Sequence, residues 1–123
     1  MITKPKRNKF GAKPTIVDGI RFASKAEATR YMDLKLLEKA GHISGLKLQP
    51  SFLLTAADEF GNTFDIGHYV ADFEYLDETG ARVVEDVKGG RATQTPLFKW
   101  KREHFEAQYG IPVSLVDGKG RAA

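Results

Sequence analysis

Two β-prone segments joined by a short turn constrain the fold of this chain more than any other feature. Residues His68–Leu76 and Ala81–Lys88 are rich in valine, tyrosine and phenylalanine, and a four-residue polar turn ending in glycine separates them. This pattern predicts an antiparallel hairpin. Because side chains alternate between the two faces of a strand, we expect Asp86 and Lys88 to point to one face and Glu85 to the other.

The rest of the chain alternates between strand and helix patterns. A capping signal and apolar residues at helical spacing predict a first helix over about 24–40. The other expected elements are a hairpin over Thr15–Phe22, a strand interrupted by Pro50 over Leu46–Thr55, a polar loop over Ala56–Asp65, a second helix from about Pro96 to Tyr109 and a last strand over Pro112–Val116. We therefore expect an α+β fold, an α/β sandwich in which helices flank a central mixed sheet.

Positive charge is concentrated at the start of the chain. The protein has 19 basic and 16 acidic residues, and residues 1–14 hold five of the basic residues and no acidic one. The remaining sequence therefore holds 14 basic against 16 acidic residues. We expect a basic flexible arm over 1–14, a single domain over 15–117 and a short tail over 118–123. Such an arm suits contact with a phosphate backbone, although a merely solvated terminus has the same composition.

The chain contains no cysteine and no long apolar segment. Without cysteine it cannot form a disulfide, a thiolate zinc site or a thiol nucleophile. No segment has the roughly 20 consecutive apolar residues of a membrane-spanning helix. We expect a cytoplasmic protein, in the bacterial host cytoplasm if a phage encodes it, that binds neither a membrane nor an organic cofactor.

Acidic residues in and near the predicted hairpin are candidates for a metal-dependent site. Asp86 and Lys88 are two residues apart in one strand, a spacing that suits metal binding beside a phosphate but also suits a charged edge strand. Asp72 lies in an otherwise apolar run, and the predicted hairpin brings it near Asp86. Two adjacent carboxylates repel each other unless a proton or a cation lies between them, and oxygen ligands suit Mg²⁺ or Mn²⁺. Structural ion pairs with lysine or arginine are the alternative.

Glu27 is a further acidic candidate. It stands three residues after Ser24 at the expected start of the first helix, which is the capping-box position. This position predicts a hydrogen bond from the backbone amide of Ser24 to the Glu27 carboxylate. A carboxylate in the first turn of a helix packed on the sheet would also complete an acidic cluster, and the two roles are compatible.

Four short motifs follow one another along residues 14–116. They are Phe22-x-Ser24-Lys25-x-Glu27-Ala28-x-x-Tyr31, Leu48-Gln49-Pro50-x-Phe52, Tyr69-x-Ala71-Asp72-Phe73 and Glu85-Asp86-Val87-Lys88-Gly89. In this order they resemble a family of short phage and prophage proteins of the PD-(D/E)xK nuclease superfamily, which includes Holliday-junction resolvases and other endonucleases. The resemblance implies a restriction-endonuclease-like core and hydrolysis of phosphodiester bonds that depends on Mg²⁺ or Mn²⁺.

The resemblance also implies roles for individual residues. Asp72 and Asp86, together with the backbone carbonyl of Val87, are expected to hold the metal ion. Glu27 is expected to bind the ion directly or through water. Lys88 is expected to orient the attacking water or to stabilise charge on the phosphate.

Two more residues are expected beside the site. Gln49 corresponds to a polar residue near the site in some relatives. Glu85 takes the place of Asp86 if the strand is shifted by one residue, although the alternation of side chains favours Asp86. The sequence departs from the superfamily motif at Ala71, where the motif has proline.

The expected function is endonucleolytic cleavage of DNA, selective for a structure such as a branch or junction in phage replication or recombination. Resolving a junction takes two coordinated cuts, so we expect a homodimer. The candidate DNA contacts are Lys4, Lys6, Arg7, Lys9, Arg91, Thr93, Lys99 and Arg102. A non-catalytic DNA-binding or interaction protein that retains the nuclease fold is the alternative.

Overall fold

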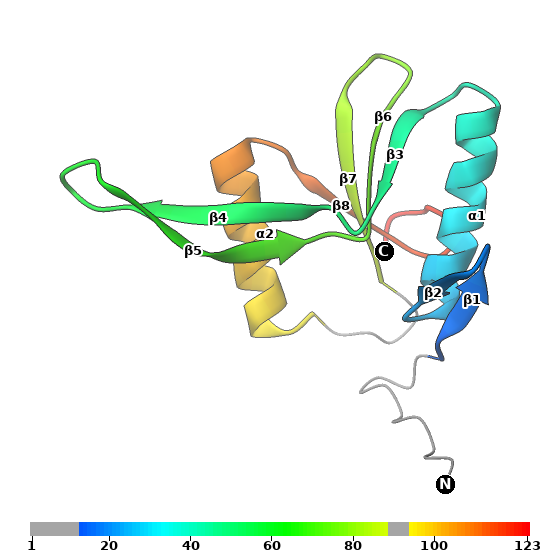
Figure 1. Cartoon of the computed structure of the whole chain (residues 1–123), viewed down its shortest axis with the longest axis horizontal. Helices are drawn as coiled ribbons and strands as arrows, with labels where there is room; N and C mark the ends of the chain where they lie inside the picture. Colours follow the sequence, from blue (N-terminus) through cyan, green and yellow to red (C-terminus); the bar gives the residue numbers. More distant parts are fainter. Residues whose placement is uncertain (1–12, 89–93) are drawn as a thin grey trace, which may run out of the picture.

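The computed structural model of the protein describes residues 13–88 and 94–123 and has an α+β fold, as expected. Figure 1 shows a helix at one end of the molecule, a central group of strands and a long projecting hairpin. The elements are β1 (Thr15–Val17), β2 (Ile20–Phe22), α1 (Lys25–Lys39), β3 (Ser44–Leu48), β4 (Ser51–Ala57), β5 (Thr63–Val70), β6 (Phe73–Leu76), β7 (Arg82–Val87), α2 (Pro96–Tyr109) and β8 (Val113–Val116).

The central sheet has four strands in the order β3-β6-β7-β8. The β6–β7 hairpin is antiparallel, as the sequence predicts, and Phe73 pairs with Glu85. Strand β8 lies parallel to β7 and follows it through α2, so the sheet is mixed. Parallel neighbours need such a crossover, which explains why a helix separates β7 and β8 along the chain.

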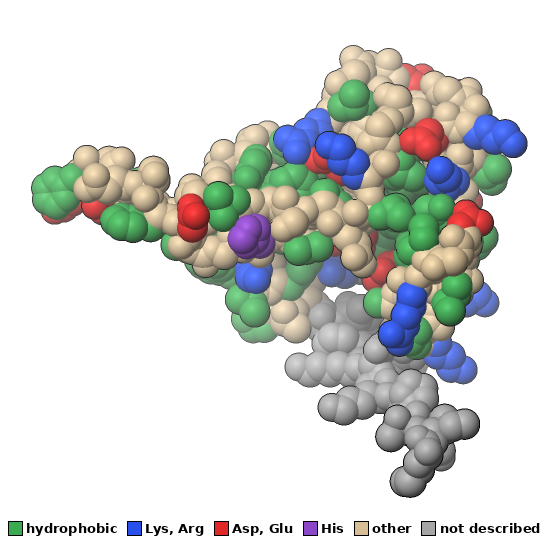
Figure 2. All heavy atoms as spheres, viewed as in Figure 1, with side chains coloured by type: hydrophobic (Ala, Val, Ile, Leu, Met, Phe, Trp, Pro, Cys, Tyr) green, Lys and Arg blue, Asp and Glu red, His purple; other side chains and the backbone are tan. Residues whose placement is uncertain are grey.

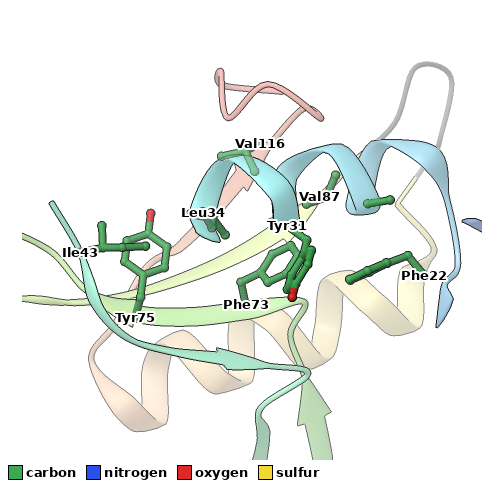
Figure 3. Packing of buried hydrophobic residues seen from close by; sticks show 9 residues of the cluster. Phe22, Tyr31, Leu34, Ile43, Phe73, Tyr75, Val87 and Val116 are labelled. Atoms are coloured by element: carbon green, nitrogen blue, oxygen red, sulfur yellow. The ribbon is translucent and has the colours of Figure 1, made fainter. Parts of the chain in front are cut away.

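Two hydrophobic clusters cover the two faces of the central sheet. The cluster on the α1 side is shown in Figure 3 and consists of Phe22, Ala28, Tyr31, Leu34, Ile43, Phe73, Tyr75, Val87 and Val116. The cluster on the α2 side consists of Phe52, Leu54, Tyr69, Ala71, Val84, Phe105 and Val113. Strand β7 contributes Val87 to the first and Val84 to the second, so it is buried on both faces. The two helices therefore flank the sheet as expected.

Two of the expected strands are each broken and divided between sheets. The predicted strand Leu46–Thr55 is divided between β3 and β4, and the predicted strand His68–Leu76 between β5 and β6. The first break lies at Gln49 and Pro50, because proline lacks an N–H for a strand ladder and Gln49 has a left-handed backbone with φ 50°. Strands β4 and β5 form a separate two-stranded sheet that projects from the domain (Figure 1).

The projecting hairpin also corrects the expected polar loop. Strand β4 continues to Ala57 and β5 begins at Thr63, so most of the predicted loop Ala56–Asp65 is either strand or a tight turn. In the turn, the side chain of Asp58 accepts hydrogen bonds from the backbone of Phe60 and Asn62, both at 2.9 Å. This local turn closes the hairpin without the long loop that the polar composition indicated.

Both helices begin and end near the predicted residues. Ser24 caps α1 and Thr95 caps α2, each accepting a backbone hydrogen bond at 3.1 Å through its side chain. At the C-terminus, residues 118–123 fold back, and Ala122 forms an antiparallel bridge with Val116 of β8. Among the residues described, neither helix has the length and apolar character needed to cross a membrane.

Candidate functional site

Asp72 and Asp86 lie side by side at the junction between the two sheets. Because Phe73 pairs with Glu85, the next pair of positions along the hairpin is Asp72 and Asp86. The backbone N–H of Asp72 donates to Oδ1 of Asp86 at 3.2 Å, and the N–H of Val87 donates to Oδ2 of Asp72 at 2.7 Å. Backbone amides thus hold one oxygen of each carboxyl group.

Burial and the contact between the two carboxyl groups shift the pKa values of this pair. Burial, followed by the negative charge of Asp72, raises the pKa of Asp86 to about 7, while hydrogen bonding from Tyr69 and the positive charge of Lys88 lower it. Burial also raises the pKa of Asp72, and hydrogen bonding from Val87 lowers it. The two carboxyl groups interact directly and therefore titrate as a pair.

Glu27 joins this pair from the first turn of α1. Its half-buried carboxyl group has a pKa raised to about 7, first by burial and then by the charge of Asp72. The backbone N–H of Glu27 donates to Oγ of Ser24, which confirms the helix cap. Its carboxylate is bonded by the backbone of Ala23, one residue before the amide that the capping box predicts.

A small pocket of about 80 Å³ lies between Glu27 and Asp72. Gln49 also lines it, in agreement with the expectation that this residue lies beside the site. The left-handed backbone of Gln49 is uncommon for a residue other than glycine, and conformations of this kind cluster at functional sites as well as in turns. The pocket is large enough for a few water molecules. It is lined by Ile20, Arg21, Phe22, Glu27, Leu48, Gln49, Asp72 and Phe73.

Lys88 supplies positive charge at the end of β7. Its backbone N–H donates to the carbonyl of Val116 at 2.7 Å, which fixes the residue beside β8. Its Nζ lies 3.5 Å from the centre of the Phe98 ring on α2. The charge of Lys88 lowers the pKa values of Glu27, Asp72 and Asp86. One lysine is therefore close enough to interact with all of the candidate acids.

Glu85 has a different environment from the three candidate acids. It points to the α1 side, where Arg30 binds both of its oxygens at 2.8 Å and 2.7 Å. The hydroxyl of Tyr75 also donates to it. Asp86 points to the α2 side, where the Tyr69 hydroxyl donates to it. The shifted alignment that would place Glu85 in the site is therefore wrong, and Glu85 anchors α1 to the sheet.

The ligand atoms of the site are of the kind that binds a divalent cation, but in this structure they are not arranged around one point. Glu27, Asp72 and Asp86 offer oxygen ligands and excess negative charge, which suit Mg²⁺ or Mn²⁺. Within residues 13–88 and 94–123, no three acidic, histidine or cysteine side chains are grouped closely enough to hold a metal ion as they stand. At Val87, whose carbonyl is the expected metal ligand, the structure shows the backbone N–H donating to Asp72. The residues fit the ion by chemistry, with the carboxyl groups still engaged by their neighbours.

Comparison with known proteins identifies the family of the chain. A family model described as "Protein of unknown function (DUF1064)" matches residues 7–116. The chain belongs to this family. The DUF1064 match extends over every strand and helix, and it contains Glu27, Asp72, Asp86 and Lys88. Searches of curated proteins and of solved structures gave no match.

The expected DNA contacts of this DUF1064 protein fall into two groups. Lys4, Lys6, Arg7, Lys9, Arg91 and Thr93 lie outside the described residues. On α2, Lys99 is exposed, whereas Arg102 is half-buried and pairs with Glu106 at 3.0 Å. Lys99 thus remains available to a phosphate, while Arg102 already has a carboxylate partner. Trp100 on the same helix is also exposed, at 50%.

Three residues that bond acidic side chains of this DUF1064 protein have roles that the sequence did not indicate. Tyr69 bonds Asp86, and Arg30 and Tyr75 both bond Glu85. Each contact joins residues at least ten positions apart, from different elements. Tyr75 matches an ordinary strand position and Arg30 an ordinary helix position, so no local signal distinguishes them. Tyr69 opens one of the four motifs, which is the local signal that could have indicated it.

Proposed function

We propose that this protein is a divalent-cation-dependent nuclease that hydrolyses phosphodiester bonds in DNA. The observation that supports this most is the grouping of Glu27, Asp72 and Asp86, which come from α1, the β5–β6 junction and β7. Asp72 is close enough to raise the pKa values of both Glu27 and Asp86, and Lys88 is the nearby cation whose charge reaches all three acids.

The contrast with the other buried acids strengthens the proposal. Glu85 has Arg30 as its partner, and Glu74 has Arg82 at 2.7 Å. In the described part of the chain, none of the three candidate acids forms a salt bridge of this kind. Acids that repel one another without an arginine partner are costly, and a bound cation would offset that cost. Such clusters are found preferentially at functional sites.

The proposed roles follow from the contacts of each side chain. Asp72 and Asp86 would hold the cation, and Glu27 would bind it directly or through water. When bound, the cation lowers the pKa of a coordinated water and stabilises charge on the phosphate oxygens. The Val87 amide orients the Asp72 carboxylate and the Tyr69 hydroxyl orients that of Asp86.

Lys88 would stabilise the negative charge that develops on the phosphate. The Phe98 ring lies against its ammonium group and restricts the positions that this group takes. In the reaction, a water oxygen forms a bond to phosphorus, the bond from phosphorus to the ester oxygen breaks, and that oxygen receives a proton. No covalent enzyme intermediate is required.

We further propose that the enzyme is an endonuclease selective for DNA structure, such as a branch or junction. The folded region is a single small α+β unit, and its site lies where the β4–β5 sheet leaves the central sheet. Residues 13–88 and 94–123 hold no separate module for recognising a base sequence. Recognition of DNA shape then depends on contacts with the phosphate backbone, to which exposed cations such as Lys99 contribute.

A cleavage assay tests the proposed function directly. The purified protein is incubated with linear, nicked, flapped and four-way DNA in Mg²⁺, in Mn²⁺ or in EDTA, as wild type and as Asp72→Asn, Asp86→Asn and Lys88→Ala. We expect cleavage only with a divalent cation and a loss of at least about 100-fold in each variant. Lys47→Ala and Glu59→Gln are matched controls, because both residues are exposed and belong to other surfaces.

The outcomes separate hydrolysis from simple binding. Cleavage that persists in EDTA, or that survives Lys88→Ala unchanged, contradicts the proposed mechanism. DNA binding without cleavage under any metal condition supports the alternative of a non-catalytic DNA-binding protein. Calorimetric titration with Mn²⁺ adds an independent measurement of metal binding, because Asp72→Asn should abolish the binding while Glu59→Gln should not.

A further inference from the structure

The projecting β4–β5 hairpin has two edges that differ in their surroundings. Side chains of α2 cover the β4 edge. Gln108 and Tyr109 donate hydrogen bonds to the carbonyl of Leu53 at 3.1 Å and 2.8 Å, and the N–H of Thr55 donates to Gln108 at 2.9 Å. The Gln108 side chain thus binds the carbonyl of Leu53 and the N–H of Thr55, as the backbone of a neighbouring strand would. This edge of the hairpin is closed.

The β5 edge has no such cover among the described residues. The backbone groups of Leu53 and Thr55 point to α2 and therefore away from β5. Each of these residues thus belongs to a non-hydrogen-bonded pair of the antiparallel hairpin. Their partners across the hairpin are His68 and Asp65. The N–H and C=O groups of His68 and Asp65 therefore point away from β4. In residues 13–88 and 94–123, no strand pairs with β5 on that side.

A β-bulge determines which residues of β5 present their backbone at this edge. Leu54 pairs with Gly67 and Thr55 with Asp65, so Ile66 is an extra residue in β5. Gly67 has φ 150°, a conformation that favours glycine at the bulge. Because of the bulge, the backbone groups of Asp65 and His68 point in the same direction although the two residues are three positions apart. Both direct their backbone groups outward, and their side chains share the face that carries Leu53 and Thr55.

Exposed apolar side chains accompany this open edge. Phe64, Ile66 and Val70 of β5 are 56%, 43% and 54% exposed. Figure 2 shows hydrophobic side chains along the projecting hairpin and at its tip, together with acidic side chains. Proteins usually protect an open, apolar strand edge by pairing or covering it. The combination of free backbone groups and apolar side chains therefore indicates an interaction surface.

We propose that two copies of this protein pair antiparallel through β5, with a twofold axis between Ile66 and Gly67. In this alignment Asp65 of one copy lies opposite His68 of the second copy, and the reverse pair forms on the other side of the axis. The carboxylate and the imidazole can form a hydrogen bond or an ion pair in both places. The two hairpins then form one continuous four-stranded sheet.

Three features of β5 make a second copy the best occupant of this edge. In this alignment an acid lies opposite a histidine twice, because the twofold axis repeats the pair of Asp65 and His68. The N–H and C=O groups of Asp65 and His68 both point outward, as they must to form hydrogen-bonded pairs with an antiparallel strand. The apolar Phe64, Ile66 and Val70 are repeated in the second copy and lose exposed surface on pairing.

Sedimentation equilibrium of the full-length protein tests the pairing and its register. We expect a dimer for the wild type. His68→Asp places two acids opposite each other twice and should raise the dissociation constant at least about tenfold. The double variant D65H/H68D exchanges the partners and should restore the dimer. Ile66→Lys should also weaken it, whereas Leu36→Lys on the exposed face of α1 should leave it unchanged.

Cysteine cross-linking supplies a second test, because the chain has no native cysteine. In the proposed dimer, position 65 of one copy lies opposite position 68 of the other, with Cα atoms about 5.5 Å apart, which a disulfide can bridge. A mixture of D65C and H68C proteins should form cross-linked dimers under mild oxidation. Either variant alone should not, because like positions are separated by about 10 Å along the strands.

Each outcome bears directly on the proposal. If the wild type is a monomer at every concentration, the proposal is overturned. The partner of the β5 edge would then be an extended segment of a different protein. A dimer that His68→Asp does not weaken, or single cysteine variants that cross-link as well as the mixture, also overturn it. Circular dichroism and thermal unfolding verify that each variant is folded. None of these measurements involves DNA cleavage, so the result is independent of the proposed nuclease activity.

Discussion

The hydroxyl of Tyr69 donates a hydrogen bond to the buried carboxylate of Asp86. Tyr69 belongs to β5 of the projecting hairpin, whereas Asp86 belongs to β7 of the central sheet. This contact connects the two sheets at the point where the chain passes between them. It also places a neutral donor, rather than a cation, beside an acid whose pKa burial raises to about 7.

Tyr69→Phe tests this contact, since it removes the hydroxyl and keeps the ring in its cluster. The hydrogen bond favours the charged carboxylate, so its loss should raise the pKa of Asp86 further. The acidic limb of the pH profile of kcat/KM for DNA cleavage should then move to higher pH. Tyr31→Phe is the control, because its hydroxyl bonds Asp18 at 3.0 Å outside the site. An unchanged profile in Tyr69→Phe contradicts the role given to this contact.

Asp72→Asn should separate stability from activity. Asparagine can still accept the hydrogen bond from Val87, while the charge that repels Asp86 and Glu27 is removed. In urea unfolding at neutral pH without metal, the variant should be as stable as the wild type or more stable by about 1 kcal/mol. DNA cleavage should be lost. A large decrease in stability would indicate that Asp72 is a structural residue.

Arg30→Gln should destabilise the protein strongly. The substitution leaves Glu85, which is 2% exposed, without its cationic partner. Removing one member of a buried ion pair costs about 3–5 kcal/mol. Lys35→Gln on the same helix is the matched control, because Lys35 pairs with Glu38 at 3.4 Å on the surface. That variant should change the unfolding free energy by less than about 1 kcal/mol. Similar losses in both variants would contradict the structural role of Arg30.

The stability of the metal-free protein should fall as pH rises through the range set by Glu27. The pKa of this residue is raised from the ordinary value of 4.5 to about 7 in the folded protein. Between these values the folded state binds more protons than the unfolded state, so the unfolding free energy decreases with increasing pH and levels off above about 7. Glu27→Gln should reduce this slope. Urea unfolding from pH 4 to pH 8 measures it, and an equal slope in both proteins would be inconsistent with the raised pKa.

Gly120→Ala should destabilise the folded C-terminus. Gly120 has φ 80°, and a Cβ atom added there would lie 2.2 Å from Nη1 of Arg30. The left-handed backbone costs about 1 kcal/mol for alanine, and displacing the buried guanidinium from Glu85 adds to this. Gly61→Ala has a similar φ of 86° in open space and isolates the backbone cost. Thermal unfolding should show the larger loss in Gly120→Ala. Equal losses would mean that Arg30 moves without penalty.

The helices, the short hairpins and the alternation along β7 were all predictable because they depend on local patterns. The serine cap indicated the start of the first helix, and the alternation correctly separated Glu85 from Asp86. The strand breaks were not predictable in the same way. The residues on either side of Ala71 are as β-prone as those of an unbroken strand, and the passage to another sheet depends on contacts with distant segments.

The candidate site was predictable in composition but not in detail. Paired strands bring Asp72 beside Asp86 through local register alone, and the sequence indicated this. The partner that neutralises Glu85 is Arg30, 55 residues away. A sequence pattern does not specify which of two neighbouring acids receives an arginine. The arginine partner of Glu85 therefore becomes visible only in the folded chain.

The position of β7 between two covered faces has a consequence for how this family can vary. Glu85 and Asp86 are adjacent in the chain but serve opposite faces, one facing Arg30 and the other facing Tyr69. Insertion or deletion of one codon within this strand would exchange the faces of every residue beyond it. Asp86 would then face Arg30 in place of Glu85. Length changes should therefore be excluded from β7, whereas the turn of the projecting hairpin can tolerate them.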